Sequence, residues 1–216
     1  MRPRLLVGVA GTATEIGKTW AGAEVASGLR ALGLDVAARK PVQSHDPDDP
    51  APLDAEVLAQ ATGEDPGAVC PAHRTLPVAM APPMAADVLG LQRPRLDELV
   101  SEITWPDGLD VGLLETVGGV ASPIAGDADS RALLRACKVD VTLLVADAGL
   151  GTIDAVRTGL GHLELDHVVV LLNRFDADDD LHRRNRDWLR QADGIDAATS
   201  CSEVVARLVR LLDSRN

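Results

Sequence analysis

Aromatic side chains are scarce in this sequence of 216 residues, where Trp and Phe together make up 2% and Tyr does not occur. Single-stranded nucleic acids are held by stacking their bases on aromatic rings, which this chain has in very small number. Basic residues are in deficit as well, because 21 Lys and Arg stand against 33 Asp and Glu and leave a formal net charge of −12. Since a phosphate backbone binds to a basic face, these two shortages argue against a nucleic-acid partner.

Cysteines and long hydrophobic runs are also sparse. Cys70, Cys137 and Cys201 are odd in number, far apart and without a CxxC pair, which fits neither a disulfide framework nor a zinc knuckle and favours a reducing compartment. No apolar run approaches the roughly 18 residues that a membrane helix needs. The short apolar run near the start leads into a glycine-rich loop, which predicts a first strand rather than a signal peptide. We expect a cytoplasmic protein that does not bind membranes.

Strand-length apolar runs alternate with helical patterns along the whole chain. Continuous apolar runs are typical of strands buried on both faces of a parallel sheet, and strand–helix alternation predicts βαβ units. We therefore expect a single α/β domain over residues 1–216, with a mostly parallel sheet between two helical layers. The expected strands are residues 5–10, 35–39, 111–114, 141–146, 168–172 and 195–199. The expected helices are residues 19–32, 54–62, 95–104, 128–137, 153–163, 181–191 and 202–212.

A glycine-rich loop, residues 11–19 (GTATEIGKT), follows the first expected strand and opens the first expected helix. It departs from the common GxxxxGK[ST] pattern, because Thr12 stands at the first position, one residue after Gly11. Its backbone N–H groups can still surround a phosphate at the positive end of the helix, and Lys18 can neutralise phosphate charge while the Thr19 hydroxyl binds Mg²⁺. The loop predicts a P-loop NTPase-like nucleotide site. A glycine turn that only caps the helix is the alternative.

Three further polar residues are expected at the carboxyl edge of the sheet, where ligands bind in such folds. Lys40 ends the second expected strand and is either a surface lysine or a compact cation of the crevice, as Lys18 is. Glu115 ends a buried strand and precedes two glycines, so we expect its carboxylate low in the crevice, where Mg²⁺ would use it together with Thr19. Asp54 lies near a helix start, where it either caps the helix or serves the site.

The GTATEIGKT loop is similar to the GTDTEVGKT-type loop of the dethiobiotin synthetases, ATP-dependent ligases of biotin synthesis. Other segments resemble the same family in the same order along the chain. They are residues 39–44 (RKPVQS), 53–55 (LDA), 114–119 (LETVGG) and 149–154 (GLGTID), followed by Asn173. The resemblance implies a P-loop NTPase-like fold and an ATP- and Mg²⁺-dependent ring-closing ligase.

The resemblance also implies the reaction and the assembly. The family carboxylates an amine of 7,8-diaminopelargonate with carbon dioxide, activates the carbamate with the γ-phosphate of ATP and closes a cyclic urea. The substrate carboxylate is received by a helix start of a second subunit. We therefore expect a homodimer with shared active sites.

Functional positions of the family correspond to particular residues of this sequence. Those that would take part in catalysis are Lys18, Lys40 and Thr14. Those that would bind ATP are Thr14, Glu15, Ile16, Gly17, Lys18, Thr19 and Asn173. Those that would contact the substrate are Lys40, Ser44, Gly151, Thr152 and Asp154. Those that would hold Mg²⁺ are Thr19, Asp54 and Glu115.

Four departures from the family pattern leave other functions open. Ala13 replaces Asp, Thr116-Val117 replaces Gly-Ala, Asp154-Ala155 replaces Asn-His, and no Gly-x-Ile-Pro follows the last expected strand. The second and third departures favour a paralogue that carboxylates or ligates another amine. A partner-gated P-loop ATPase switch is the third hypothesis, but such proteins carry a second lysine early in the loop, where this chain has Ala13.

Overall fold

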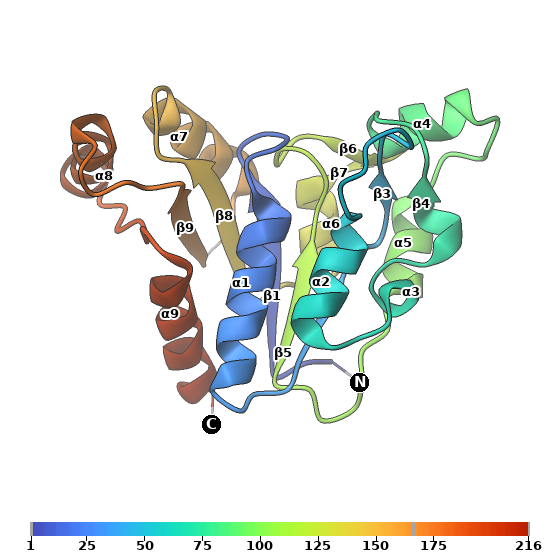
Figure 1. The fold of residues 1–216 in the computed structure, drawn as a ribbon, viewed down its shortest axis with the longest axis horizontal. Helices are drawn as coiled ribbons and strands as arrows, with labels where there is room; N and C mark the ends of the chain where they lie inside the picture. The colour runs from blue at the N-terminus through green and yellow to red at the C-terminus, as the bar shows by residue number, and fades with distance from the viewer. Residues whose placement is uncertain (1, 166, 216) are drawn as a thin grey trace.

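A five-stranded sheet lies at the centre of the computed structural model, which describes residues 2–165 and 167–215 (Figure 1). Its strand order is β2-β5-β1-β8-β9, and all neighbouring pairs are parallel. The strands are β1 (Leu5–Gly11), β2 (Val36–Arg39), β5 (Val111–Glu115), β8 (Val141–Asp147) and β9 (Val168–Asn173). Each lies within one residue of an expected range, because a mainly apolar run of this length is readily buried on both faces of a sheet.

Helices cover both faces of this sheet and complete three layers (Figure 1). They are α1 (Lys18–Ala31), α2 (Asp54–Thr62), α3 (Pro66–Val69), α4 (Pro82–Val88), α5 (Leu96–Glu102), α6 (Ser130–Ala136), α7 (Thr152–Leu163), α8 (Asp180–Asp193) and α9 (Cys201–Asp213). On one face, α1, α2 and α9 pack against alternate strand residues such as Val7 and Val9. On the other face, α4 to α7 pack against the intervening residues such as Leu6 and Leu144. The expected α/β fold is thus confirmed, and none of the helices in the described ranges is long and apolar enough to cross a membrane.

The prediction of a strand over residues 195–199 is wrong. In the structure this segment makes one parallel bridge, between Leu171 and Ala198. Ala198 donates to Val170 O at 2.8 Å and accepts from Leu172 N at 2.9 Å. Two residues later, Ser200 caps α9 by accepting from Glu203 N, so the chain turns away before a strand can form.

Two expected helices are shorter than their patterns. Residues 128–129 form strand β7 (Ala128–Asp129), which pairs with β6 (Pro123–Ala125), so the helix expected over 128–137 begins only at Ser130. The Asp129 side chain caps it by accepting from Ala132 N at 2.8 Å. Of the residues expected to form a helix over 95–104, only those of α5 are helical. The Asp129 cap, which depends on one local hydrogen bond, decides where α6 begins.

A small second sheet places the residues that follow Lys40. Strands β3 (Gln43–Ser44) and β4 (Thr75–Leu76) pair in parallel, with Gln43 opposite Thr75. The sequence pattern did not indicate them, because two residues carry no periodicity. The acidic residues 46–52 that come next are exposed. This short pair of strands turns the chain back toward the carboxyl edge of the main sheet.

Candidate active site

The phosphate loop, residues 12–17, joins β1 to α1 at the carboxyl edge of the sheet, the upper edge in Figure 1. Gly17 has φ 89°, and a Cβ at this position would lie 2.3 Å from Asn173 Nδ2. The same Asn173 nitrogen donates to Ile16 O at 2.9 Å. Only glycine therefore fits at the start of α1, since it alone tolerates both the left-handed backbone and the close amide. Asn173, expected to bind ATP, supports the loop that would hold the phosphates.

A second support of the loop was missed by sequence reasoning. Glu15 is exposed and has φ 58°, and its carbonyl oxygen accepts from Arg174 at 3.0 Å. The other guanidinium nitrogen of Arg174 pairs with Asp147 Oδ2 at 3.1 Å. Arg174 therefore ties the phosphate loop to the end of β8. The position of Arg174 directly after Asn173 is the sequence signal that could have indicated its role.

The loop after β5 approaches the phosphate loop closely. Gly118 has φ 55°, and a Cβ there would lie 2.3 Å from Ser122 Oγ and 3.6 Å from Thr14 Oγ1. A Cβ on Gly119 would lie 3.2 Å from Thr12 O. The two glycines thus let two loops of the crevice meet backbone to backbone.

Lys18, the first residue of α1, lies buried in the phosphate loop. Its Nζ donates to Ala13 O at 3.3 Å. Burial, together with repulsion from the nearby Lys40 ammonium, lowers the pKa of Lys18 below its ordinary value. A phosphate in the loop would supply the negative charge that this buried ammonium needs. Thr14, also expected in catalysis, is exposed on the same loop.

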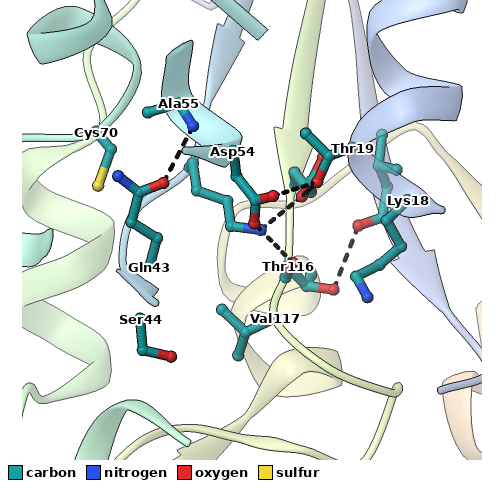
Figure 2. A network of polar contacts seen from close by, with 12 residues as sticks. Lys18, Thr19, Gln43, Ser44, Asp54, Ala55, Cys70, Thr116 and Val117 are labelled. Atoms are coloured by element: carbon teal, nitrogen blue, oxygen red, sulfur yellow. Dashed lines mark hydrogen bonds and ion pairs between the residues drawn. The ribbon is translucent and has the colours of Figure 1, made fainter. Parts of the chain in front are cut away.

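A hydroxyl, two carboxylates and an ammonium form one network beside the loop (Figure 2). Thr19 Oγ1 lies 2.8 Å from Asp54 Oδ1 and 2.8 Å from Glu115 Oε1, and its single proton serves one of them at a time. Lys40 Nζ lies 2.6 Å from Asp54 Oδ2 and 2.5 Å from Glu115 Oε1, and it donates to Thr116 O at 3.3 Å. The structure therefore brings together the expected metal residues and one expected catalytic lysine.

Burial and pairing compete in this network. Burial disfavours the Lys40 ammonium, but the carboxylates of Glu115 and Asp54 outweigh it and raise the pKa of Lys40. Burial also disfavours ionised Asp54, yet the Lys40 ammonium and the Thr19 hydroxyl lower the pKa of that carboxyl. At Glu115 burial prevails over Lys40 and raises its pKa. Lys40 is thus held as a cation, and Asp54 as an anion.

The oxygen atoms of the network fit a Mg²⁺ ion. Glu115 Oε2 is buried and has no hydrogen-bond partner in the part of the chain that the structure describes. Asp54 is more open, with 44% of its side chain exposed. Mg²⁺ takes one or two carboxylates and completes its shell with phosphate and water oxygens. Accordingly, residues 2–165 and 167–215 contain no cluster of three or more Asp, Glu, His or Cys side chains that could hold a metal.

The expected substrate residues lie in two places. Ser44, on β3, is half-buried and donates to Met80 O at 2.5 Å, close to the network in Figure 2. Gly151, Thr152 and Asp154 lie instead at the start of α7, with Asp154 exposed. Thr152 Oγ1 is buried, and the described residues offer it no hydrogen-bond partner. Ser44 therefore follows β2 and the start of α7 follows β8, two strands on opposite sides of β1 in the sheet.

The two residues that replace Gly-Ala after Glu115 behave differently. Thr116 is fully buried, and its hydroxyl donates to Val9 O in β1 at 3.2 Å, so it points into the sheet. Val117 is half-buried and lies between Ser44 and Thr116 in Figure 2. Of the two substitutions, Val117 is the one whose side chain is open to the side on which Ser44 is drawn.

A strand, a glycine loop and a helix that starts with Lys18 and Thr19, set on a parallel sheet with helices on both faces, define a P-loop nucleotide-binding protein. Solved structures share this fold. The chain matches chloroplast FtsY from Physcomitrella patens with a TM-score of 0.53 at 18% identity, over 94% of this chain and 61% of that one. It matches a ParA family ATPase from Chlorobium tepidum TLS with a TM-score of 0.52 at 11% identity, over 91% and 82%. At these identities the likeness concerns the fold alone.

Sequence relatives narrow the class. A family model described as an AAA domain (AAA_26) matches residues 6–214. The chain is 38% identical over 156 residues to the ATP-dependent dethiobiotin synthetase BioD of Caulobacter vibrioides, covering 70% of each. It is 35% identical to that of Haloferax mediterranei over 86% of this chain and 79% of the relative, and 32% identical to that of Aquifex aeolicus over 89% and 86%. The chain belongs to the dethiobiotin synthetase family, which confirms the resemblance of its loop.

Proposed function

We propose that the crevice around Lys18 and Lys40 makes dethiobiotin from 7,8-diaminopelargonate, carbon dioxide and ATP. The family relationship makes the protein an ATP-dependent ligase of biotin synthesis. The observation that carries the assignment of the site is the contact of Lys40 with Asp54 and Glu115 beside the phosphate loop. This contact supports a site in which Lys40, Asp54 and Glu115 act together with Lys18 on a triphosphate.

The reaction needs three bonds to form in turn. An amine of the substrate attacks carbon dioxide and loses a proton, which gives a carbamate. A carbamate oxygen attacks the γ-phosphorus of ATP, and ADP leaves. The neighbouring amine attacks the carbamate carbon and loses a proton, and inorganic phosphate leaves as the cyclic urea closes. The protein has to hold two anions side by side and neutralise charge while the phosphoryl group moves.

The residues of the crevice suit these tasks. Lys18 and the backbone N–H groups of residues 14–19 bind the phosphates, with Thr14 and Glu15 at the exposed crest of the loop. Lys40 draws the carbamate toward the γ-phosphate, since its ammonium is compact and stays charged. Ser44 lies beside the substrate amines. Asn173 acts on ATP through the loop that its amide supports.

We assign Thr19, Asp54 and Glu115 as the residues that hold Mg²⁺. Bound there, the ion would neutralise phosphate charge and orient the γ-phosphate. Lys40 Nζ occupies the space between the two carboxylates, so metal binding requires Lys40 to share them or to move toward the substrate. Glu115 Oε2 supports the assignment, because it is buried and none of the described residues forms a hydrogen bond with it.

We further propose a homodimer in which the start of α7 serves the active site of the second copy. Leu150, just before that helix, is 93% exposed, which supports a role for this loop at an interface. Gly151, Thr152 and the N–H groups of α7 would receive the substrate carboxylate. Sedimentation of the purified protein at several concentrations tests the dimer.

We propose a single ATP-binding ligase domain over residues 1–216, which the match of the family model over residues 6–214 supports. We propose the cytoplasm as its location, where ATP is abundant. The free thiols of Cys70, Cys137 and Cys201 support a reducing compartment.

Phosphate release is the direct test of this function. The protein is incubated with ATP and Mg²⁺, alone or with bicarbonate and 7,8-diaminopelargonate. We expect release that depends on both additions, together with dethiobiotin detected by mass spectrometry. Equal release with ATP alone would support a switch-type ATPase, and release without dethiobiotin would support another product.

A paralogue that acts on another amine is the second candidate, and the exposed Asp154 favours it. This carboxylate lies in the first turn of α7, where the family's substrate carboxylate would bind. An anion at this point would attract an ammonium group instead. Testing a panel of diamines without a carboxylate in the same assay separates the two functions.

A further inference from the structure

Helix α2, which carries Asp54 as its first residue, is capped only in part by its own residues: Glu56 Oε2 accepts from Leu53 N at 2.8 Å, but the acceptor for Ala55 N lies outside the helix. Its N-cap residue is Leu53, which has no side-chain acceptor. Helices α6, α8 and α9, in contrast, are capped by the side chains of Asp129, Asp179 and Ser200. The first N–H groups of a helix lack intrahelical partners and need another acceptor. In α2 the acceptor for Ala55 N comes from a distant strand.

Gln43 supplies the acceptor for Ala55 N (Figure 2). Its Oε1 accepts from Ala55 N at 3.0 Å in a buried hydrogen bond. Since a backbone N–H can only donate, the amide oxygen must face Ala55 and the amide nitrogen must face the other way. The nitrogen donates to Thr75 Oγ1 at 3.0 Å, across the β3–β4 pair. Gln43 is 3% exposed, so both bonds are shielded from water.

This cap acts on Asp54 through the backbone. Asp54 directly precedes Ala55, and its carboxylate contacts both Thr19 Oγ1 and Lys40 Nζ. Because its side chain is 44% exposed, packing restricts its place less than that of the buried Glu115. The start of α2 therefore decides where the carboxylate can reach.

We propose that Gln43 is a positioning residue for Mg²⁺ binding, which holds the start of α2 so that the Asp54 carboxylate reaches the metal together with Thr19. This rests on the proposed role of Asp54 as a ligand. Groups that orient metal ligands typically change metal affinity by about ten- to a hundredfold when they are removed. Gln43 also adjoins Ser44, so one two-residue strand serves both the substrate end and the metal end of the crevice.

The decisive variant is Gln43→Met, which keeps the length of the side chain and removes both hydrogen bonds of its amide group. Binding of Mn²⁺ is measured by electron paramagnetic resonance in the presence of a non-hydrolysable ATP analogue. We expect the dissociation constant for Mn²⁺ to rise about tenfold. Affinity for the analogue without metal should change less than twofold, because Lys18 and the phosphate loop are untouched.

Thr62→Val is the matched control at the other end of α2. Thr62 is buried, and its hydroxyl donates to Leu58 O at 2.9 Å, so the variant also removes a buried hydrogen bond from this helix. It should lower the melting temperature and leave Mn²⁺ affinity within twofold of the parent. Equal weakening of Mn²⁺ binding in Gln43→Met and Thr62→Val would overturn the proposal, since general loosening of α2 would then explain both.

Two more variants complete the test. Thr75→Val removes the support of the Gln43 amide, together with the contact of the Thr75 hydroxyl with Cys70 Sγ at 3.6 Å. It should raise the Mn²⁺ dissociation constant about two- to threefold, and it tests the proposal if Gln43→Met does not fold. Asp54→Asn reports on the proposed function itself. Unchanged Mn²⁺ binding in Asp54→Asn removes Asp54 from the metal, and the role of Gln43 with it. Weakened binding in Asp54→Asn with unchanged binding in the Gln43 and Thr75 variants overturns the positioning role alone.

Discussion

Two parts of the carboxyl edge are built in opposite ways. Beside β1, β2 and β5, Lys40 and Glu115 are buried at 3% and 1% side-chain exposure and contact each other at 2.5 Å. At the start of α7, Leu150 is 93% exposed and Asp154 is exposed as well. The first part is complete within one chain, with its charges paired before any ligand arrives. The second part presents an exposed helix start, which we propose serves the substrate site of a second copy.

This difference has a consequence for mutations. Buried and paired groups depend strongly on each other, because removing one partner leaves the other without compensation. Exposed groups are screened by water, and changing them has small effects. We therefore expect large effects in the phosphate and carboxylate part and small effects at the start of α7.

The largest effect is expected for Lys18→Ala. The phosphates then lose the buried cation of the loop, so turnover should fall by about 100-fold or more and ATP affinity should fall with it. Phosphate release and nucleotide binding by calorimetry measure the two quantities. Lys138→Ala, which changes an exposed lysine, should match the parent. Turnover in Lys18→Ala close to that of the parent would remove Lys18 from the phosphate site.

Lys40→Met should show how strongly the carboxylates of Glu115 and Asp54 depend on the Lys40 ammonium. Without the ammonium, Glu115 and Asp54 lose their counter-charge, and the metal-free protein should lose about 3–5 kcal/mol of its unfolding free energy. Mg²⁺ should then raise the melting temperature of this variant more than that of the parent, because the ion replaces the lost cation. Thermal unfolding with and without Mg²⁺ measures both effects, with Lys138→Met as the control. An equal response of variant and parent to Mg²⁺ would place the metal away from these carboxylates.

Glu115→Gln should have an intermediate effect. The fold should persist, since Gln fills the same volume, but one charged oxygen ligand becomes neutral. We expect the Mg²⁺ concentration for half-maximal activity to rise about tenfold. Superimposable Mg²⁺ titrations of variant and parent would make Glu115 a structural residue only.

Asp154→Asn should have the smallest effect, because Asp154 lies exposed at the start of α7. Two like charges at about 4 Å repel each other by on the order of 1 kcal/mol in water, so removing the Asp154 charge should lower the KM for 7,8-diaminopelargonate by several-fold. Asp178→Asn, a change on another exposed segment, serves as the control. A higher KM in Asp154→Asn would mean that Asp154 attracts an ammonium group, in favour of the paralogue.

Long apolar runs and the phosphate loop could be predicted because their signals are local. The five central strands follow from continuous burial, and α2 from its helical pattern ended by Gly63, which has φ 75°. The pairs β3–β4 and β6–β7 could not be predicted, since two- and three-residue strands form only when distant chain segments meet. The prediction of a strand over 195–199 was wrong, because the chain turns into the cap of α9 after a single bridge.

By itself, the sequence determined the order of the five central strands and of the longer helices, the phosphate loop and the family, because each depends on residues that are neighbours in the chain. Only the tertiary structure decided the partners within the site. Lys40 and Glu115 are 75 residues apart, and Asn173 and Ile16 are 157 apart. Such contacts arise where parallel strands bring their carboxyl ends to one edge, and their geometry depends on packing and register. The same is true of the Gln43 cap, since the acceptor for Ala55 N at the start of α2 is supplied by another strand.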